Sequence, residues 1–172
     1  PFYIPSSSME PNLLIGDRLF VSKYSYGYSR HSLPFSLKLY DKRILEKFPE
    51  RGDIIVFKTP ADNRTDYIKR LIGLPGDVIQ IINKDLYINN IKVQKVEVKT
   101  IRKINCGNEV VNVSSFEETL PNGKSYTAVY RTYGTMINTD KFIVPENHYF
   151  FMGDNRDCSK DSRFLSSVGY VN

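Results

Sequence analysis

The sequence predicts a mostly β protein built from antiparallel sheets. Runs rich in β-branched and aromatic residues recur along the chain, and glycine or proline bounds them. No window shows a convincing apolar repeat of 3.6 residues, which an amphipathic helix would require. Short polar turns between neighbouring runs favour hairpins and meanders over long parallel crossovers.

The first half of the chain contains the clearest strand signals. Arg18–Tyr24 and Asp53–Lys58 are apolar and β-branched, and each is expected to form one strand. Asp66–Gly73 is a third such run, and it leads directly into a turn. There Pro75 and Gly76 stand where a type II turn has its two central residues.

The second half continues the pattern with shorter strands. Residues 78–93 read as a meander of three strands joined by the turns "NKD" and "NN". Residues 125–130 and 141–144 are expected to be further strands, and 148–152 an apolar strand that runs into a polar turn. Two stretches are loosely patterned: we expect 26–50 to form a hairpin extension, and 100–125, polar and turn-rich, to belong to an insertion.

Composition excludes several classes of function. The formal net charge of +5 comes from scattered lysines and arginines, which disfavours a nucleic-acid-binding stripe. There is no signal peptide and no apolar stretch of the ~18 residues that span a bilayer. The two histidines and two cysteines form no metal or cofactor cluster, and one disulfide between Cys106 and Cys158 stays open as an option. Because the sequence begins at Pro1 rather than methionine, we expect further chain before it.

A run of three serines, Ser6–Ser8, lies between two prolines near the start of the chain. Serine runs are commonly solvated linkers, but a turn and a strand follow this one at once. A nucleophilic hydroxyl needs a base within hydrogen-bonding reach. His31 reads as a loop residue and His148 as a turn residue, so neither is expected to be that base.

Lysine is the alternative base, and Lys69 is the candidate. A useful neutral fraction near pH 7–8 requires a pKa depression of roughly 2–3 units, which corresponds to roughly 3–4 kcal/mol. Desolvation supplies such a depression, so the lysine must lie in an apolar strand. Lys69 does, in "DYIKRLIG", with Tyr67 and Leu71 on its own strand face and Ile68 and Ile72 on the other. The competing interpretation is a lysine that extends its amine to solvent at a sheet edge.

The segment Met152–Arg163, "MGDNRDCSKDSR", follows an apolar strand and is dense in charge. One interpretation is a solvated loop. The other is a rigid, hydrogen-bonded active-site turn, because Gly, Asp and Asn in sequence after a buried strand form such turns. Its alternating aspartates and arginines can then form a buried ionic network.

Four segments in this order resemble the conserved blocks of bacterial type I signal peptidase (leader peptidase), a Ser/Lys-dyad serine protease family: "PSSSMEPNLLIGD", "RGDIIVFKTP", "DYIKRLIGLPGD" and "GDNRDCSKDSR". The resemblance implies an antiparallel β-sheet catalytic core, of the fold shared with self-cleaving repressors, with a β-rich insertion. We expect core parts at 1–77 and 146–172 and the variable insertion at 78–145. In that family the chain continues beyond the position of Asn172.

The resemblance implies a role for each matched residue. Ser8 is the nucleophile and Lys69 the general base, and no metal or cofactor takes part. The Ser6 hydroxyl and the Ser8 backbone N–H form the oxyanion hole. The substrate, an exported preprotein, is cut after small residues at positions −1 and −3 of its signal peptide. The residues implied to line the substrate groove are Phe2, Ile4, Pro5, Tyr67 and Ile68.

The last block adds supporting residues. Ser159 matches the serine that orients the lysine amine, while Asp161 and Arg163 match a salt-bridged pair, and Gly153 opens the block. Cys158 stands where the family commonly carries asparagine. A free thiol there, beside Ser159, would make activity sensitive to alkylation.

The resemblance also implies a location. The catalytic domain is expected on the periplasmic face of the bacterial cytoplasmic membrane, anchored by one or more transmembrane helices before Pro1. Exposed Phe and Leu residues in 26–50 would then contact the lipid surface; alternatively, they cover a small core of their own.

Two other interpretations share some of these features. A self-cleaving Ser/Lys repressor cuts itself at a small-residue–Gly bond before its serine, whereas Cys106–Gly107 lies far after Ser8. A non-catalytic β module that binds extended peptides or membrane surfaces would keep the groove without needing Lys69.

Overall fold

The computed structural model describes residues 2–22 and 48–172. It confirms the prediction of a mostly β protein, because the strands in every described sheet pair antiparallel. Most of the predicted hairpin extension, residues 26–47, lies outside the described residues, as does His31. In the described part of the chain, no helix has the length and apolar character needed to span a membrane.

One sheet of three strands carries the candidate base. Its order is β12-β4-β3, with β3 at Ile54–Lys58, β4 at Asp66–Gly73 and β12 at Phe150–Met152. Lys69 in the central strand pairs with Ile55 of β3. From Lys69 onward every residue of β4 is buried, so the charged side chains of Lys69 and Arg70 lie in the interior beside Leu71 and Ile72.

The predicted meander is confirmed as part of a second sheet, of order β11-β5-β6-β7. Its turns contain Asn83 and Lys84, then Asn89 and Asn90, all with positive φ angles, as type I′ hairpin turns require. The predicted type II turn before β5 is also present: Gly76 has φ +85°, and Asp77 N donates to Leu74 O. The strands are β5 (Val78–Ile82), β6 (Asp85–Ile88), β7 (Ile91–Lys92) and β11 (Phe142–Ile143).

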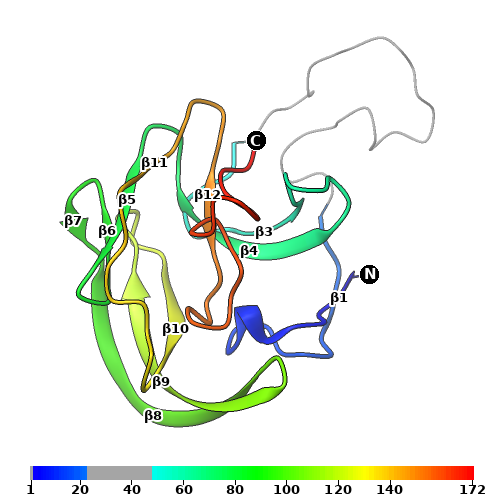
Figure 1. The fold of residues 1–172 in the computed structure, drawn as a ribbon, viewed down its shortest axis with the longest axis vertical. Coiled ribbons are helices and arrows are strands. Elements are labelled where there is room, and N and C mark those ends of the chain that lie inside the picture. The colour runs from blue at the N-terminus through cyan, green and yellow to red at the C-terminus, as the bar shows by residue number, and fades with distance from the viewer. Residues whose placement is uncertain (1, 23–47) are drawn as a thin grey trace.

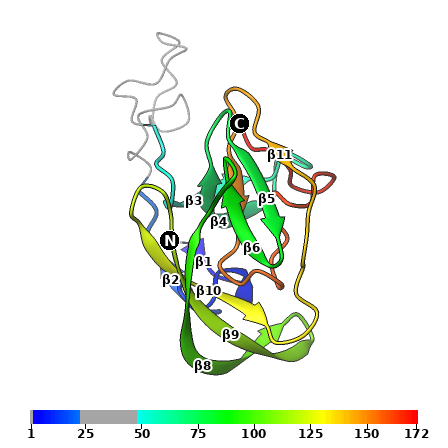
Figure 2. The same ribbon diagram turned by 90° about the vertical axis from the view of Figure 1, so that its left-hand side faces the viewer.

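The two longest strands occupy the stretch that we expected to be turn-rich. β8 (Gln94–Cys106) and β9 (Glu109–Thr119) form a hairpin, and β10 (Ser125–Arg131) completes the sheet. The expectation fails because only alternate residues, such as Val111 and Val113, are apolar and buried, while their neighbours face solvent. Figures 1 and 2 show this hairpin as a long curved ribbon.

The N-terminal segment forms a short two-stranded sheet and one helical turn. β1 (Phe2–Tyr3) pairs with β2 (Arg18–Leu19), and the 3-10 helix η1 covers Ser7–Met9. The strand predicted over Arg18–Tyr24 is shorter than expected, because the described part of β1 offers no partner beyond Leu19. The helix η1 contacts both β4 and β8, so it lies between two sheets.

The main core joins the sheets beneath the site. Its buried apolar residues come from β4, β5, β6, β10, β11, β12 and neighbouring connections, and Phe150 and Leu86 are almost fully buried in it. The chain leaving β12 then runs along β10, where Val129 bridges to Asn155 in parallel. The polar segment 153–163 is therefore held between this core and η1 (Figure 1).

Candidate active site

The structure brings Ser8 and Lys69 together, although 61 positions separate them in sequence. Ser8 lies in η1 and Lys69 in β4, and Lys69 Nζ is 2.7 Å from Ser8 Oγ. Both residues are buried, with exposed fractions of 6% and 4%. His148 bonds instead to the Glu146 carbonyl through Nδ1, so it is not the partner of Ser8.

Burial controls the charge of Lys69. Desolvation lowers the pKa of Lys69 to about 8, against opposing attraction from Asp161 and Asp154 and with a smaller lowering effect of Arg163. Its amine also donates to the Ile68 carbonyl at 3.0 Å and lies 5.1 Å from the centre of the Tyr67 ring. A large fraction of the amine is therefore neutral at mildly alkaline pH.

The other two serines of the run lie differently. Ser6 is exposed, and its hydroxyl donates a hydrogen bond of 3.3 Å to Ser8 Oγ. Ser7 is buried, and its carbonyl accepts hydrogen bonds from the Asn155 side chain at 3.1 Å and from the Glu10 N–H. Ser7 thus fixes the turn, while the hydroxyls of Ser6 and Ser8 lie next to each other.

The loop of residues 153–163 is fastened directly to the serine turn. Asn155 N donates to Ser8 O at 3.1 Å. At Gly153 the approach is so close that a Cβ would lie 2.5 Å from Ser8 O and 2.2 Å from Ser159 Oγ. Only glycine fits at position 153, since real Cβ atoms do not approach other atoms this closely.

Ser159 lies against this glycine, but it does not hydrogen-bond the lysine. Lys69 Nζ bonds to Ser8 and to the Ile68 carbonyl. Among the described residues, no partner makes a well-formed hydrogen bond with the buried Ser159 hydroxyl, which interacts electrostatically with Asp161. An orienting role for Ser159 therefore requires its hydroxyl to turn toward the amine.

Asp161 and Arg163 form a buried bidentate ion pair, with Nε–Oδ1 and Nη2–Oδ2 distances of 2.8 Å. Burial by itself would raise the pKa of Asp161, but the charge of Arg163 and hydrogen bonds hold it below its ordinary value. Asp161 Oδ2 also accepts a hydrogen bond from Gly153 N at 2.9 Å. The pair therefore fixes the backbone beside Ser8.

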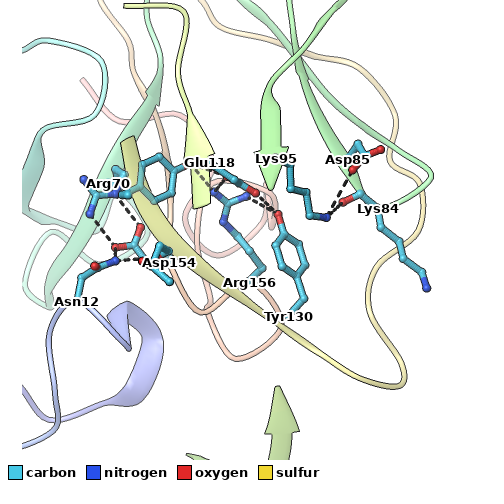
Figure 3. A network of polar contacts seen from close by, with 12 residues as sticks. Asn12, Arg70, Lys84, Asp85, Lys95, Glu118, Tyr130, Asp154 and Arg156 are labelled. Atoms are coloured by element: carbon cyan, nitrogen blue, oxygen red, sulfur yellow. Dashed lines mark hydrogen bonds and ion pairs between the residues drawn. The ribbon is translucent and has the colours of Figure 1, made fainter. Parts of the chain in front are cut away.

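The predicted ionic network is confirmed, but three of the residues that take part in it lie outside the segment. Arg70 makes a bidentate ion pair with Asp154, and Asn12 donates to the same carboxylate at 2.7 Å (Figure 3). Glu118 of β9 pairs with Arg156. The sequence did not predict these positions for Asn12, Arg70 and Glu118; for Arg70 the available signal was a second cation in the same strand as Lys69.

The residues predicted to line a groove come from β1, β4 and the connection to η1. Phe2, Tyr67 and Ile68 are half-buried and Pro5 is exposed. Ile4 is buried, with an exposed fraction of 2%, so its side chain offers no open surface in this structure. In the described residues, no group of three or more acidic, histidine or cysteine side chains is arranged to hold a metal ion.

The optional disulfide is present. Cys106, at the end of β8, is bonded to Cys158, beside Ser159, and both pack against a small cluster that includes Val111 and Val129. The expectation that alkylation of Cys158 lowers activity is therefore wrong for the oxidised protein, because Cys158 carries no free thiol.

We expect this disulfide to stabilise the fold. Its half-cystines are 52 positions apart, and closing a loop of that length in the unfolded chain is worth about 4 kcal/mol. Replacing both cysteines by serine should lower the urea midpoint of unfolding. Wild-type protein treated with a reductant should match the variant; equal midpoints for oxidised wild type and variant would contradict the expectation.

Comparison with known proteins gives this geometry a context. The sequence matches the family described as "Signal peptidase, peptidase S26" over residues 1–172. The chain belongs to the signal peptidase family. It is 47% identical over 180 residues to signal peptidase I of Rickettsia massiliae (strain Mtu5), and 46% identical over 180 residues to that of Rickettsia prowazekii (strain Madrid E).

These alignments cover 99% of this chain but 65% and 66% of the two rickettsial proteins, so it spans about two thirds of the length of these signal peptidase relatives. A crystal structure of a signal peptidase I from Enterococcus faecalis V583 has 30% sequence identity and a TM-score of 0.40. That match covers 71% of this chain and 90% of the other.

Proposed function

We propose that this chain is the catalytic part of a serine endopeptidase that removes signal peptides from exported preproteins. The observation that carries the proposal is the buried contact of 2.7 Å between Lys69 Nζ and Ser8 Oγ. A primary amine with a pKa of about 8, beside a serine hydroxyl, is suited to act as general base.

The reaction follows from this pair. Neutral Lys69 accepts the Ser8 proton while Oγ attacks the scissile carbonyl carbon, which gives a tetrahedral intermediate. The resulting ammonium protonates the leaving amine, and an acyl-enzyme remains. Water then attacks the ester, with Lys69 again as base, and Ser8 is regenerated. The Ser6 hydroxyl and the Ser8 N–H are the proposed oxyanion donors, and one such donor contributes roughly 3–4 kcal/mol in other serine proteases.

An extended peptide has a ready strand to pair with. Leu71 N donates to Asp53 O. In an antiparallel pair the backbone groups alternate in direction, so the N–H and carbonyl groups of the odd-numbered residues of β4 point toward β3. The Ile68 N–H and carbonyl then point to the opposite edge, where β12 pairs only from Arg70 onward among the described residues. A substrate strand added along Tyr67 and Ile68 would bring its carbonyl toward Ser8.

We propose the bilayer surface as a second partner, on the periplasmic side of the cytoplasmic membrane. The connection before and after β2 exposes apolar side chains, with exposed fractions of 51% for Leu14, 44% for Ile15 and 90% for Phe20. They lie on the segment that follows the catalytic serine, and such side chains favour a lipid interface over water. No metal or cofactor enters the proposal.

The test is mass spectrometry of products from a signal-peptide substrate. Wild-type protein should cut after an alanine at −1 and should not cut the matched peptide with phenylalanine there. Ser8→Ala should form no product while it keeps the wild-type circular dichroism spectrum. Peptide binding without cleavage by wild-type protein would point to a non-catalytic peptide-binding module, and equal cleavage of the two peptides would contradict the groove.

A further inference from the structure

A carboxylate from outside the four motif segments lies at the centre of a buried polar cluster. Glu118 of β9 has an exposed fraction of 1%. Its Oε2 accepts hydrogen bonds from Arg156 Nη2 at 2.6 Å and from Tyr126 Oη at 2.7 Å, and its Oε1 accepts one from Tyr130 Oη. Figure 3 shows Glu118 pointing toward the Arg156 guanidinium.

The cluster is ionic. Burial alone would raise the pKa of Glu118, but the charge of Arg156 and the two tyrosine hydroxyls hold it below its ordinary value. Lys95 is a second cation near it; its amine lies 4.0 Å from the centre of the Tyr130 ring and donates to the Lys84 carbonyl. Removing one member of such a buried pair leaves an uncompensated charge.

Arg156 connects this cluster to the loop beside the serine. It belongs to the segment 153–163, its N–H donates to Val129 O at 2.9 Å, and its carbonyl accepts a hydrogen bond from Arg163 Nη2 at 2.6 Å. Arg163 holds Asp161, and Asp161 holds the Gly153 N–H. The side chain and the N–H of Arg156 are thus bound by β9 and β10, and its carbonyl is bound by Arg163 of the candidate site.

The same loop fixes the position of the nucleophile. Asn155, the neighbour of Arg156, donates from its backbone to Ser8 O and from its side chain to Ser7 O. A displacement of Arg156 is therefore transmitted to Ser8 through the neighbouring Asn155. It is transmitted to the surroundings of Lys69 through Arg163 and Asp161, whose charges act on the amine.

We propose that Glu118 is a positioning residue for the Ser8–Lys69 pair: by fixing Arg156, it holds the loop of residues 153–163 against the serine turn. This inference rests on the proposed peptidase function for its kinetic consequences. It assigns a role in the site to the β8–β10 sheet, which carries none of the four motifs.

The test compares Glu118→Gln, which keeps the size and removes the charge, with Glu118→Asp, which keeps the charge. Glu118→Gln should lower kcat on the order of 10-fold with little change in KM, because a small misplacement of reacting groups slows the chemical step. A looser loop would also let water reach the Lys69 amine, which raises its pKa. The rising limb of the pH–rate profile should therefore move to higher pH. Glu118→Asp should recover part of kcat.

A readout independent of activity is hydrogen exchange of the peptide that covers residues 153–163, which should become faster in Glu118→Gln. The matched control is Asp77→Asn, which breaks the Arg51–Asp77 ion pair (2.7 Å) at the turn before β5. It should lower the melting temperature without changing the pH–rate profile or the exchange of that peptide.

The outcomes separate the two proposals. The positioning role would be overturned if folded Glu118→Gln kept the wild-type kcat, the wild-type rising limb of the pH–rate profile and the wild-type hydrogen exchange of residues 153–163. It would also be overturned if Glu118→Gln, Glu118→Asp and Asp77→Asn changed these three quantities equally. If Glu118→Gln does not fold, the comparison of Glu118→Asp with Asp77→Asn decides. If wild-type protein fails to cut the peptide, or Ser8→Ala cuts it equally well, the proposed peptidase function is wrong. Hydrogen exchange of residues 153–163 would still test whether Glu118 holds the loop in place.

Discussion

Replacing Lys69 by methionine or by arginine should abolish peptide cleavage while the protein stays folded. Methionine has no basic nitrogen, and a guanidinium does not release its proton in a protein. Loss of the base from a serine nucleophile reduces kcat on the order of 10⁴-fold or more. The measurement is the single-turnover cleavage rate of a signal peptide, together with circular dichroism of each variant.

The pH dependence of the wild-type protein supports the same test. Activity requires the neutral amine, so the rate should rise with pH through the pKa of about 8 and level off above it. Lys92→Arg is the matched control, because Lys92 lies on β7, half-exposed and paired with Asp85. A folded Lys69→Met variant that cuts at the wild-type rate would show that Lys69 is not the base.

Lys69→Met should also be more stable than the wild type at neutral pH. The folded-state pKa of about 8 lies below the ordinary value of 10.5, so the unfolded chain binds more protons between these two values. The destabilising effect of Lys69 is therefore complete below pH 8 and disappears as the pH rises toward 10.5. Its size is about 3 kcal/mol, at 1.36 kcal/mol per unit, and a higher melting temperature at pH 7 would reveal it.

The proposed pair of Ser8 and Lys69 was predicted from the resemblance of four sequence segments to a known family, and local chemistry agrees with that choice. A lysine in an apolar strand and a serine turn without a histidine partner restrict the choice of nucleophile and base. Strands were predictable where turn-forming residues stand at both ends, as Gly76 and Asn83 do at the two ends of β5. The hairpin of β8 and β9 was not, since its polar outer face hides the alternation that Val111 and Val113 follow on the inner one.

The residues that sequence reasoning missed act through long-range pairing. Arg70 and Asp154 are 84 positions apart, and Glu118 and Arg156 are 38 apart. Nothing in the local sequence around Glu118 distinguishes a buried carboxylate from an exposed one on a β-strand. Its partner is fixed only when β9 and β10 place it against the loop, so the tertiary structure was needed to find it.

Gly153→Ala should strongly reduce activity although it adds only one methyl group and removes no charge. Its Cβ would lie 2.2 Å from Ser159 Oγ, 2.4 Å from Ser159 Cβ and 2.5 Å from Ser8 O. The Ser159 side chain can move, but the Ser8 carbonyl belongs to the turn that carries the proposed nucleophile. We expect kcat to fall on the order of 100-fold, because a displacement of about 1 Å has that effect on reacting groups.

A double variant and a matched glycine separate the causes of this loss. Gly153→Ala with Ser159→Gly removes two of the three close contacts, so it should regain stability; it should not regain kcat, because the contact with Ser8 O remains. Gly73→Ala is the control: its Cβ would lie 2.9 Å from Phe150 Cβ, within the core, and should lower the melting temperature while the folded protein keeps its kcat. Wild-type cleavage by folded Gly153→Ala would mean that the serine turn tolerates the displacement, and full recovery in the double variant would place the sensitivity at Ser159 rather than at the Ser8 backbone.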